Sequence, residues 1–129
     1  MIVVDSSALV AILFAEDDAG RYVEALERAP SAAISAASIL ETSIVVTRRV
    51  GPAGAAELDE LIARFGIEIV PFDAAQAALA RDAFLRYGKG RHAAKLNFGD
   101  CMAYALAKTL DVPLLHKGAD FAATDLRTV

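Results

Sequence analysis

The sequence has few of the residues that build most nucleophilic and transition-metal sites. It contains no tryptophan, one cysteine and two histidines. A single cysteine permits no internal disulfide, and Cys101 lies in an apolar helical stretch, so we interpret it as a packing residue rather than a nucleophile. Without cysteine and histidine at suitable spacing, a structural zinc site is disfavoured. These absences are consistent with a reducing, cytoplasmic location.

The sequence also shows no secretion signal and no membrane anchor. The N-terminal stretch MIVVDSSALVAILF is apolar, but it has no positively charged region, is interrupted by Asp5 and is too short to span a bilayer. We therefore expect a soluble protein without a membrane partner. The 129 residues fit a single domain spanning 1–129. An apolar content of 56% is high for so small a body and predicts an interface with another chain.

Charge is distributed unevenly along the chain. The net charge of -4 excludes a globally basic nucleic-acid binder, yet residues 83–99 contain no acid. The basic residues of this stretch are Arg86, Lys89, Arg91, His92 and Lys95. We call residues 86–95 the basic segment. From its composition alone, a phosphate-contacting surface and an ordinary solvated loop are about equally consistent with it.

Short β-branched runs alternate with longer helical patterns. The predicted strands are IVV (2–4), AAIS (32–35), EIVPF (68–72) and PLLH (113–116). The predicted helices cover 7–14, 20–29, 36–50, 52–66, 74–88 and 100–110. This alternation predicts an α/β fold with a central, mainly parallel sheet and helices on both faces. In such sheets ligands bind beyond the carboxyl ends of the strands.

Four of the 17 acidic residues lie against apolar sequence: Asp5, Glu41, Asp100 and Asp120. We call them the acidic quartet. The other acids fall on polar helix faces or at turns, and Asp73, although it follows a strand, forms a capping-box pattern with Gln76. Each quartet member also has a structural explanation: a helix cap for Asp5 and Asp100, a turn for Asp120, and an arginine partner for Glu41.

Glu41 is the most informative member of the quartet. On a helix its i+3 and i+4 neighbours are Ile44 and Val45, where an ionised carboxylate is costly unless it is compensated. Ser38 shares that face and is a candidate hydrogen-bond donor. Asp5 and Asp120 both follow predicted strands and should reach one crevice. Carboxylates that meet repel one another unless a cation is present, and an all-oxygen ligand set selects Mg²⁺ or Mn²⁺.

Four motifs, in this order, resemble those of PIN-domain ribonucleases, and more closely the VapC toxins of bacterial type II toxin–antitoxin pairs. They are VVDSSALVAILF (3–14), SAASILETSIVV (35–46), LNFGDCMAYALAK (96–108) and LLHKGADFAATDL (114–126). The resemblance implies a three-layer αβα domain and an Mg²⁺- or Mn²⁺-dependent endoribonuclease that hydrolyses RNA phosphodiesters with metal-activated water. It makes the acidic quartet both catalytic and metal-binding. Ser7, rather than Ser6, would orient a ligand or water, and Asn97 would assist near Asp100.

The resemblance also implies partners. RNA would be the substrate, and an acidic pocket needs positive groups around it to hold a polyanion. Our candidates for those groups are Lys89, Arg91, Lys95 and Lys117, with Arg48 or Arg49 as helpers. A cognate antitoxin would cover the groove and direct an arginine into the acidic pocket. A homodimer, and a higher toxin–antitoxin assembly, would bring two sites together.

Four other interpretations fit some of the same residues. A receiver-like signalling domain also places acids beyond parallel strands, with Lys117 as its lysine, but it needs an acid pair where Asp5 stands alone. A haloacid-type phosphatase is disfavoured because DSS lacks its second Asp. A PIN nuclease that processes cellular RNA without an antitoxin, or a silent ion-binding module, shares the same acids.

Overall fold

A parallel four-stranded sheet forms the centre of the protein. The computed structural model describes residues 1–129, and the strand order is β3-β2-β1-β4. The strands are β1 (Ile2–Val4), β2 (Ala32–Ser35), β3 (Glu68–Val70) and β4 (Leu114–Leu115). Every pairing is parallel, and Val3 is in register with Ala33 on one side and Leu114 on the other. All four predicted strands are present, and the predicted mainly parallel sheet is confirmed.

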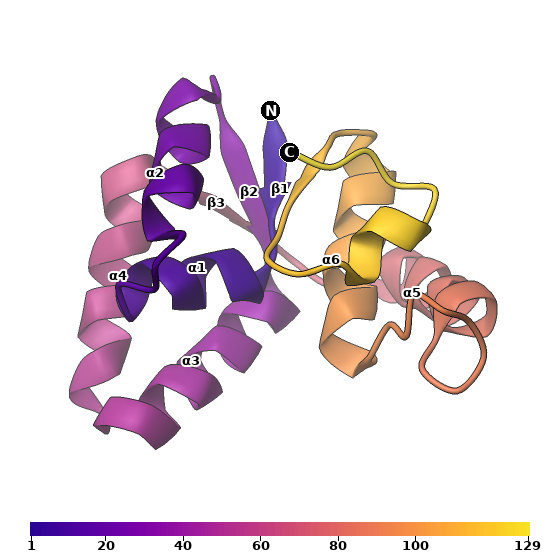
Figure 1. Ribbon diagram of the computed structural model, residues 1–129, viewed down its shortest axis with the longest axis horizontal. Helices are drawn as coiled ribbons and strands as arrows, with labels where there is room; N and C mark the ends of the chain where they lie inside the picture. Colours follow the sequence, from indigo (N-terminus) through magenta and orange to yellow (C-terminus); the bar gives the residue numbers. More distant parts are fainter.

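Helices cover both faces of this sheet, which gives three layers (Figure 1). The helices are α1 (Ser6–Leu13), α2 (Ala19–Arg28), α3 (Ala36–Val50), α4 (Ala53–Phe65), α5 (Ala74–Tyr87) and α6 (Phe98–Leu110), followed by the short 3₁₀ helix η1 (Asp120–Ala123). The first four helices lie on one side of the sheet, and α5, α6 and η1 lie on the other (Figure 1). None of the helices combines the length and apolar composition needed to cross a bilayer.

Alternation along the strands divides the hydrophobic core in two. Val3 and Leu114 pack with α5 and α6, whereas Ile2, Val4 and Leu115 pack with α1, α2 and α4. Because successive strand side chains point to opposite faces, one strand supplies both cores. The backbone that leads into the site is therefore held between two packed layers.

Helix starts are set by short polar side chains. Helix α6 begins at Phe98 rather than at the predicted Asp100, because Asn97 caps it. Asp73 caps α5 by accepting the N–H of Gln76 at 2.9 Å, as its pattern predicts. The expected reciprocal bond is absent: the Gln76 side chain donates to the carbonyl of Pro71 instead. The predicted role of Asp73 as a helix cap is confirmed, whereas the predicted return bond from Gln76 is wrong.

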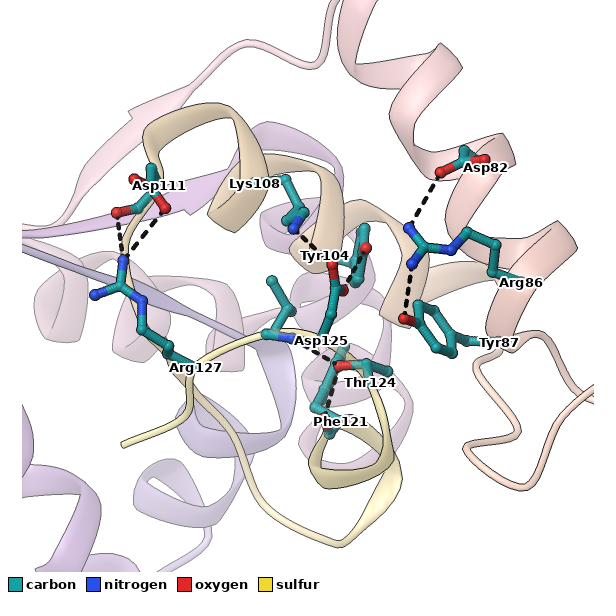
Figure 2. A network of polar contacts seen from close by, with 11 residues as sticks. Asp82, Arg86, Tyr87, Tyr104, Lys108, Asp111, Phe121, Thr124, Asp125 and Arg127 are labelled. Carbon is teal, nitrogen blue, oxygen red and sulfur yellow. Dashed lines mark hydrogen bonds and ion pairs between the residues drawn. The ribbon is translucent and has the colours of Figure 1, made fainter.

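A network of polar contacts fastens the C-terminal segment to α6 (Figure 2). The Tyr104 hydroxyl and the Lys108 ammonium each donate to the carboxylate of Asp125 at 2.7 Å. Arg127 donates to the backbone carbonyl of Asp111 at the end of α6. Phe121, buried in η1, anchors the same segment in the core. These contacts fasten to α6 the segment that follows η1, whose first residue is Asp120.

Candidate active site

The acidic quartet gathers where β1 and β4 end. Asp5 directly follows β1, Asp120 opens η1 beyond the neighbouring β4, Glu41 lies on α3 after β2, and Asp100 lies in the first turn of α6. The electrostatics reflect this proximity. The pKa of Asp5 is raised by burial and by the charges of Asp100 and Glu41, and the pKa of Asp100 by burial and by Asp120 and Glu41.

Asp5 is the most buried member, with 3% of its surface exposed. It caps α1: its Oδ2 accepts the backbone N–H of Ser7 at 3.0 Å and the Ser7 hydroxyl at 2.6 Å. Burial outweighs these two bonds and raises the pKa of the carboxyl to about 7. Its second oxygen, Oδ1, is buried and has no hydrogen-bond partner. A buried acceptor without a donor is costly, so this oxygen is suited to a cation.

Ser7 links two segments of the site. Its hydroxyl donates to Asp5 and accepts the backbone N–H of Lys117 at 2.9 Å. The end of β1 is thereby joined to the loop that follows β4, a separation of 110 positions in the chain. The contact that Ser7 makes is with the carboxylate of Asp5, so it fixes which oxygen of Asp5 remains free.

Asp100 combines capping with a place in the site. It forms a capping box with Asn97: the Asp100 N–H donates to the Asn97 side chain at 2.9 Å, and the Asn97 N–H donates to Asp100 Oδ2 at 3.0 Å. Burial raises the pKa of Asp100 to about 6 despite this bond, and nearby carboxylates add to the shift. A purely capping aspartate gains from being ionised, so the raised pKa sets Asp100 apart from an ordinary helix cap.

The Glu41 carboxylate is held by Ser6, not by Ser38. The Ser6 hydroxyl donates to Oε1 at 2.6 Å, whereas Ser38 is buried and its hydroxyl has no partner. Our Ser38 prediction is therefore wrong, because Ser38 faces into the protein while Glu41 faces α1. Neither does Glu41 form the ion pair with arginine that was its alternative explanation. Its apolar neighbour Ile44 is exposed and borders an open groove of about 490 Å³.

Asp120 is exposed, and its carboxylate makes no hydrogen bond that would stabilise the preceding turn. As the side chains stand, no three histidine, cysteine or acidic groups converge closely enough to hold a metal ion. The donor set nevertheless fits a hard divalent cation, because it consists of carboxylates and includes the unpartnered Oδ1 of Asp5.

Burial raises the pKa of Cys101, on the same helix as Asp100, to about 11, consistent with a packing residue.

The candidate cations differ in whether their charge is already paired within the chain. Lys89, Arg91 and Lys95 are exposed in the loop between α5 and α6, and none of them forms an ion pair. This loop leads directly into the α6 turn that carries Asp100 (Figure 1). Lys117, by contrast, has its ammonium between Glu16 and Asp18. Arg48 borders the groove beside Glu41, whereas Arg49 stacks on Phe14, 4.6 Å from the ring centroid.

Comparisons with known proteins agree with this arrangement. The PIN domain family matches residues 2–126. The ribonuclease VapC of Mycolicibacterium smegmatis is 50% identical over 127 residues, covering 98% of each chain. The crystal structure of Mycobacterium tuberculosis VapC20, described as a toxin that cleaves the sarcin–ricin loop, superposes with a TM-score of 0.82 at 20% identity, covering 100% of this chain and 98% of that one.

A chain from a toxin–antitoxin complex of Klebsiella pneumoniae has the same fold, with a TM-score of 0.72 at 18% identity over 97% of this chain and 93% of that one. The receiver and phosphatase readings have no support in these matches. The order of the acids, the parallel sheet that assembles them and the near full-length matches lead to one conclusion: the chain belongs to the PIN-domain family, within its VapC group.

Proposed function

We propose that the protein is a divalent-metal-dependent endoribonuclease and the toxin of a toxin–antitoxin pair. The observation that carries the proposal is the free, buried Oδ1 of Asp5 beside the negative charges of Asp100 and Glu41. A site that raises the pKa of two of its own carboxyls is electrostatically unfavourable unless a cation compensates it. The name of the VapC ribonuclease relative supports RNA as the substrate.

The acidic quartet would hold Mg²⁺ or Mn²⁺, which when bound supplies Lewis acidity toward phosphate oxygens and lowers the pKa of water. The chain's own residues prepare for this. Ser7 engages Oδ2 of Asp5 and leaves Oδ1 available, and the Asn97 N–H fixes one oxygen of Asp100. No side-chain nucleophile is needed, so we expect products with a 5′ phosphate and a 3′ hydroxyl.

The test is cleavage of an end-labelled structured RNA by purified, antitoxin-free protein in Mg²⁺, Mn²⁺ or EDTA. We expect cleavage with either metal, none in EDTA, and none with Asp100→Asn, which keeps the helix cap. Asp111→Asn, at the other end of α6, is the matched control and should cleave normally. Expression of the wild type should arrest bacterial growth and Asp100→Asn should not, which separates a toxin from an RNA-processing nuclease. Cleavage that persists in EDTA would contradict the proposal.

We propose that the basic segment binds RNA phosphates around the acidic site. Its cations Lys89, Arg91 and Lys95 form no ion pair and lie in the loop that leads into the α6 turn bearing Asp100. Replacing all three by Gln should raise KM for RNA about tenfold at 150 mM salt and leave kcat within about twofold, because phosphate contacts position the substrate. The salt dependence of binding should also become shallower. Arg28→Gln on α2, a cation paired with Glu24, is the control; equal KM values for both proteins would contradict the assignment.

We propose that an antitoxin, and a second copy of this chain, cover the exposed apolar surface beside the site. The groove of about 490 Å³ is bordered by Leu40 and Ile44 of α3 and by Phe98 of α6. Leu40 is 62% exposed and Phe98 82%. An apolar patch of this kind next to an acidic pocket is suited to an amphipathic helix that carries a basic residue. The likeness to a chain from a toxin–antitoxin complex supports this assignment.

A further inference from the structure

The carboxylate of Glu41 is restrained from two directions. On one side the Ser6 hydroxyl, from α1, donates to Oε1 at 2.6 Å. On the other side lies Gly99, in the first turn of α6. A Cβ built on Gly99 would lie 1.9 Å from Oε2 of Glu41 and 2.5 Å from its Cδ. The carboxylate therefore occupies the space that a side chain at position 99 would take.

The backbone does not require glycine at position 99. Gly99 lies within α6 and is absent from the glycines with positive φ. Alanine is the more favourable residue in a helix. The atoms that a new Cβ would meet are all at the far end of the flexible Glu41 side chain. An alanine would therefore displace the carboxylate of Glu41 rather than disturb the packing of the fold.

The groove beside α3 offers space for a displaced Glu41 carboxylate. Glu41 borders the groove of about 490 Å³ beside α3, and it is repelled by Asp5 and Asp100, whose pKa values its charge raises. Without both restraints the side chain would turn away from the other acids and toward the groove. The site needs the opposite arrangement, in which mutually repelling groups stay together.

We propose that Gly99 and Ser6 are positioning residues that hold the Glu41 carboxylate beside Asp5 and Asp100: Gly99 by leaving space, Ser6 by its hydrogen bond. This inference rests on the proposed ribonuclease function. It assigns to Ser6 a role distinct from that of Ser7, which engages Asp5 instead. Residues that orient ligands typically change metal affinity 10- to 100-fold when they are replaced.

Gly99→Ala tests the proposal, and Gly20→Ala is its matched control. Gly20 is likewise the second residue of a helix, and a Cβ there meets nothing within 4 Å. We expect Gly99→Ala to weaken Mn²⁺ binding, measured by titration calorimetry, and to lower kcat, each by about tenfold or more. Its KM for RNA and its melting temperature should match those of Gly20→Ala. Ser6→Ala should show a similar loss of Mn²⁺ affinity, which Ser6→Thr should restore.

A double substitution separates a positioning effect from an independent one. In a Glu41→Ala background, Gly99→Ala should cause no further loss of Mn²⁺ affinity or kcat, because no carboxylate remains to be displaced. An additive loss would overturn the inference, as would Gly99→Ala protein that is indistinguishable from Gly20→Ala or that melts far below it. A wild-type protein that neither binds Mn²⁺ nor cleaves RNA would instead overturn the proposed function.

Discussion

Asp5→Asn should lower kcat for RNA cleavage by roughly 1,000-fold or more, the scale seen when a central electrostatic group of an active site is removed. The substitution preserves shape and the helix cap, because an asparagine oxygen can still accept the Ser7 N–H that Asp5 accepts. The substitution removes the negative charge of the buried carboxylate, whose Oδ1 has no hydrogen-bond donor. Single-turnover cleavage of end-labelled RNA in saturating Mg²⁺ measures the effect.

Asp73→Asn is the matched control for this prediction. Asp73 caps α5 as Asp5 caps α1, since its side chain accepts a backbone N–H in the first turn of the helix. It is exposed, and it follows β3, which is separated from β1 by β2. The control should cleave RNA within about twofold of the wild type. Asp5→Asn protein that retains a tenth of the wild-type rate would show that Asp5 serves only as a cap.

The free energy of unfolding of the metal-free protein should fall as pH rises from 5 to 8. The native state keeps a proton on Asp5 up to about pH 7 and on Asp100 up to about pH 6, whereas unfolded aspartate loses its proton near 3.8. Between these values the native state binds more protons than the unfolded chain, so stability decreases with rising pH. Each pKa unit corresponds to about 1.4 kcal/mol, and we expect a loss of roughly 2–4 kcal/mol.

Urea denaturation at several pH values, with and without Mn²⁺, tests the sign. Asp5→Asn should flatten the dependence and be more stable than the wild type at pH 8, while Mn²⁺ should stabilise the wild type most at pH 8. Below about pH 4 the trend reverses, because the bond from Lys117 lowers the pKa of Asp18 and this contribution is lost on protonation. Wild-type stability that rises between pH 5 and 8 would contradict the prediction.

Much of the fold was predictable because it depends on patterns within short stretches of the sequence. The positions of strands and helices could be predicted from the spacing of apolar residues and from runs of β-branched residues. The parallel pairing of β1 with β4 could be predicted because strands alternate with helices along the chain. The acids of the quartet stood out because carboxylates against apolar sequence are costly. The structure brings these acids to one end of the sheet, where burial and the charges of neighbouring quartet members raise the pKa values of Asp5 and Asp100.

The partners of the acids were less predictable, because they depend on contacts between distant elements. Ser6 meets Glu41 across 35 positions, and the helical spacing of Ser38 suggested the wrong donor. Lys117 follows β4 as the sequence indicated, but its ammonium lies between two acids of the loop after α1. Such pairings follow from how helices pack on a sheet, which periodicity does not report. For the close approach of Glu41 to position 99, the one local sign in the sequence is the glycine itself, Gly99 of NFGD (97–100).

The order of strands affects when the site is completed during synthesis. Strand β1 is made first but lies between β2 and β4, and the Ser7–Lys117 bond joins segments 110 positions apart. Asp5, Glu41 and Asp100 all precede β4 in the chain, and one edge of β1 stays unpaired until residues 114–115 join the sheet. Asp120 follows β4, so the acidic quartet is complete only after the fourth strand has paired with β1.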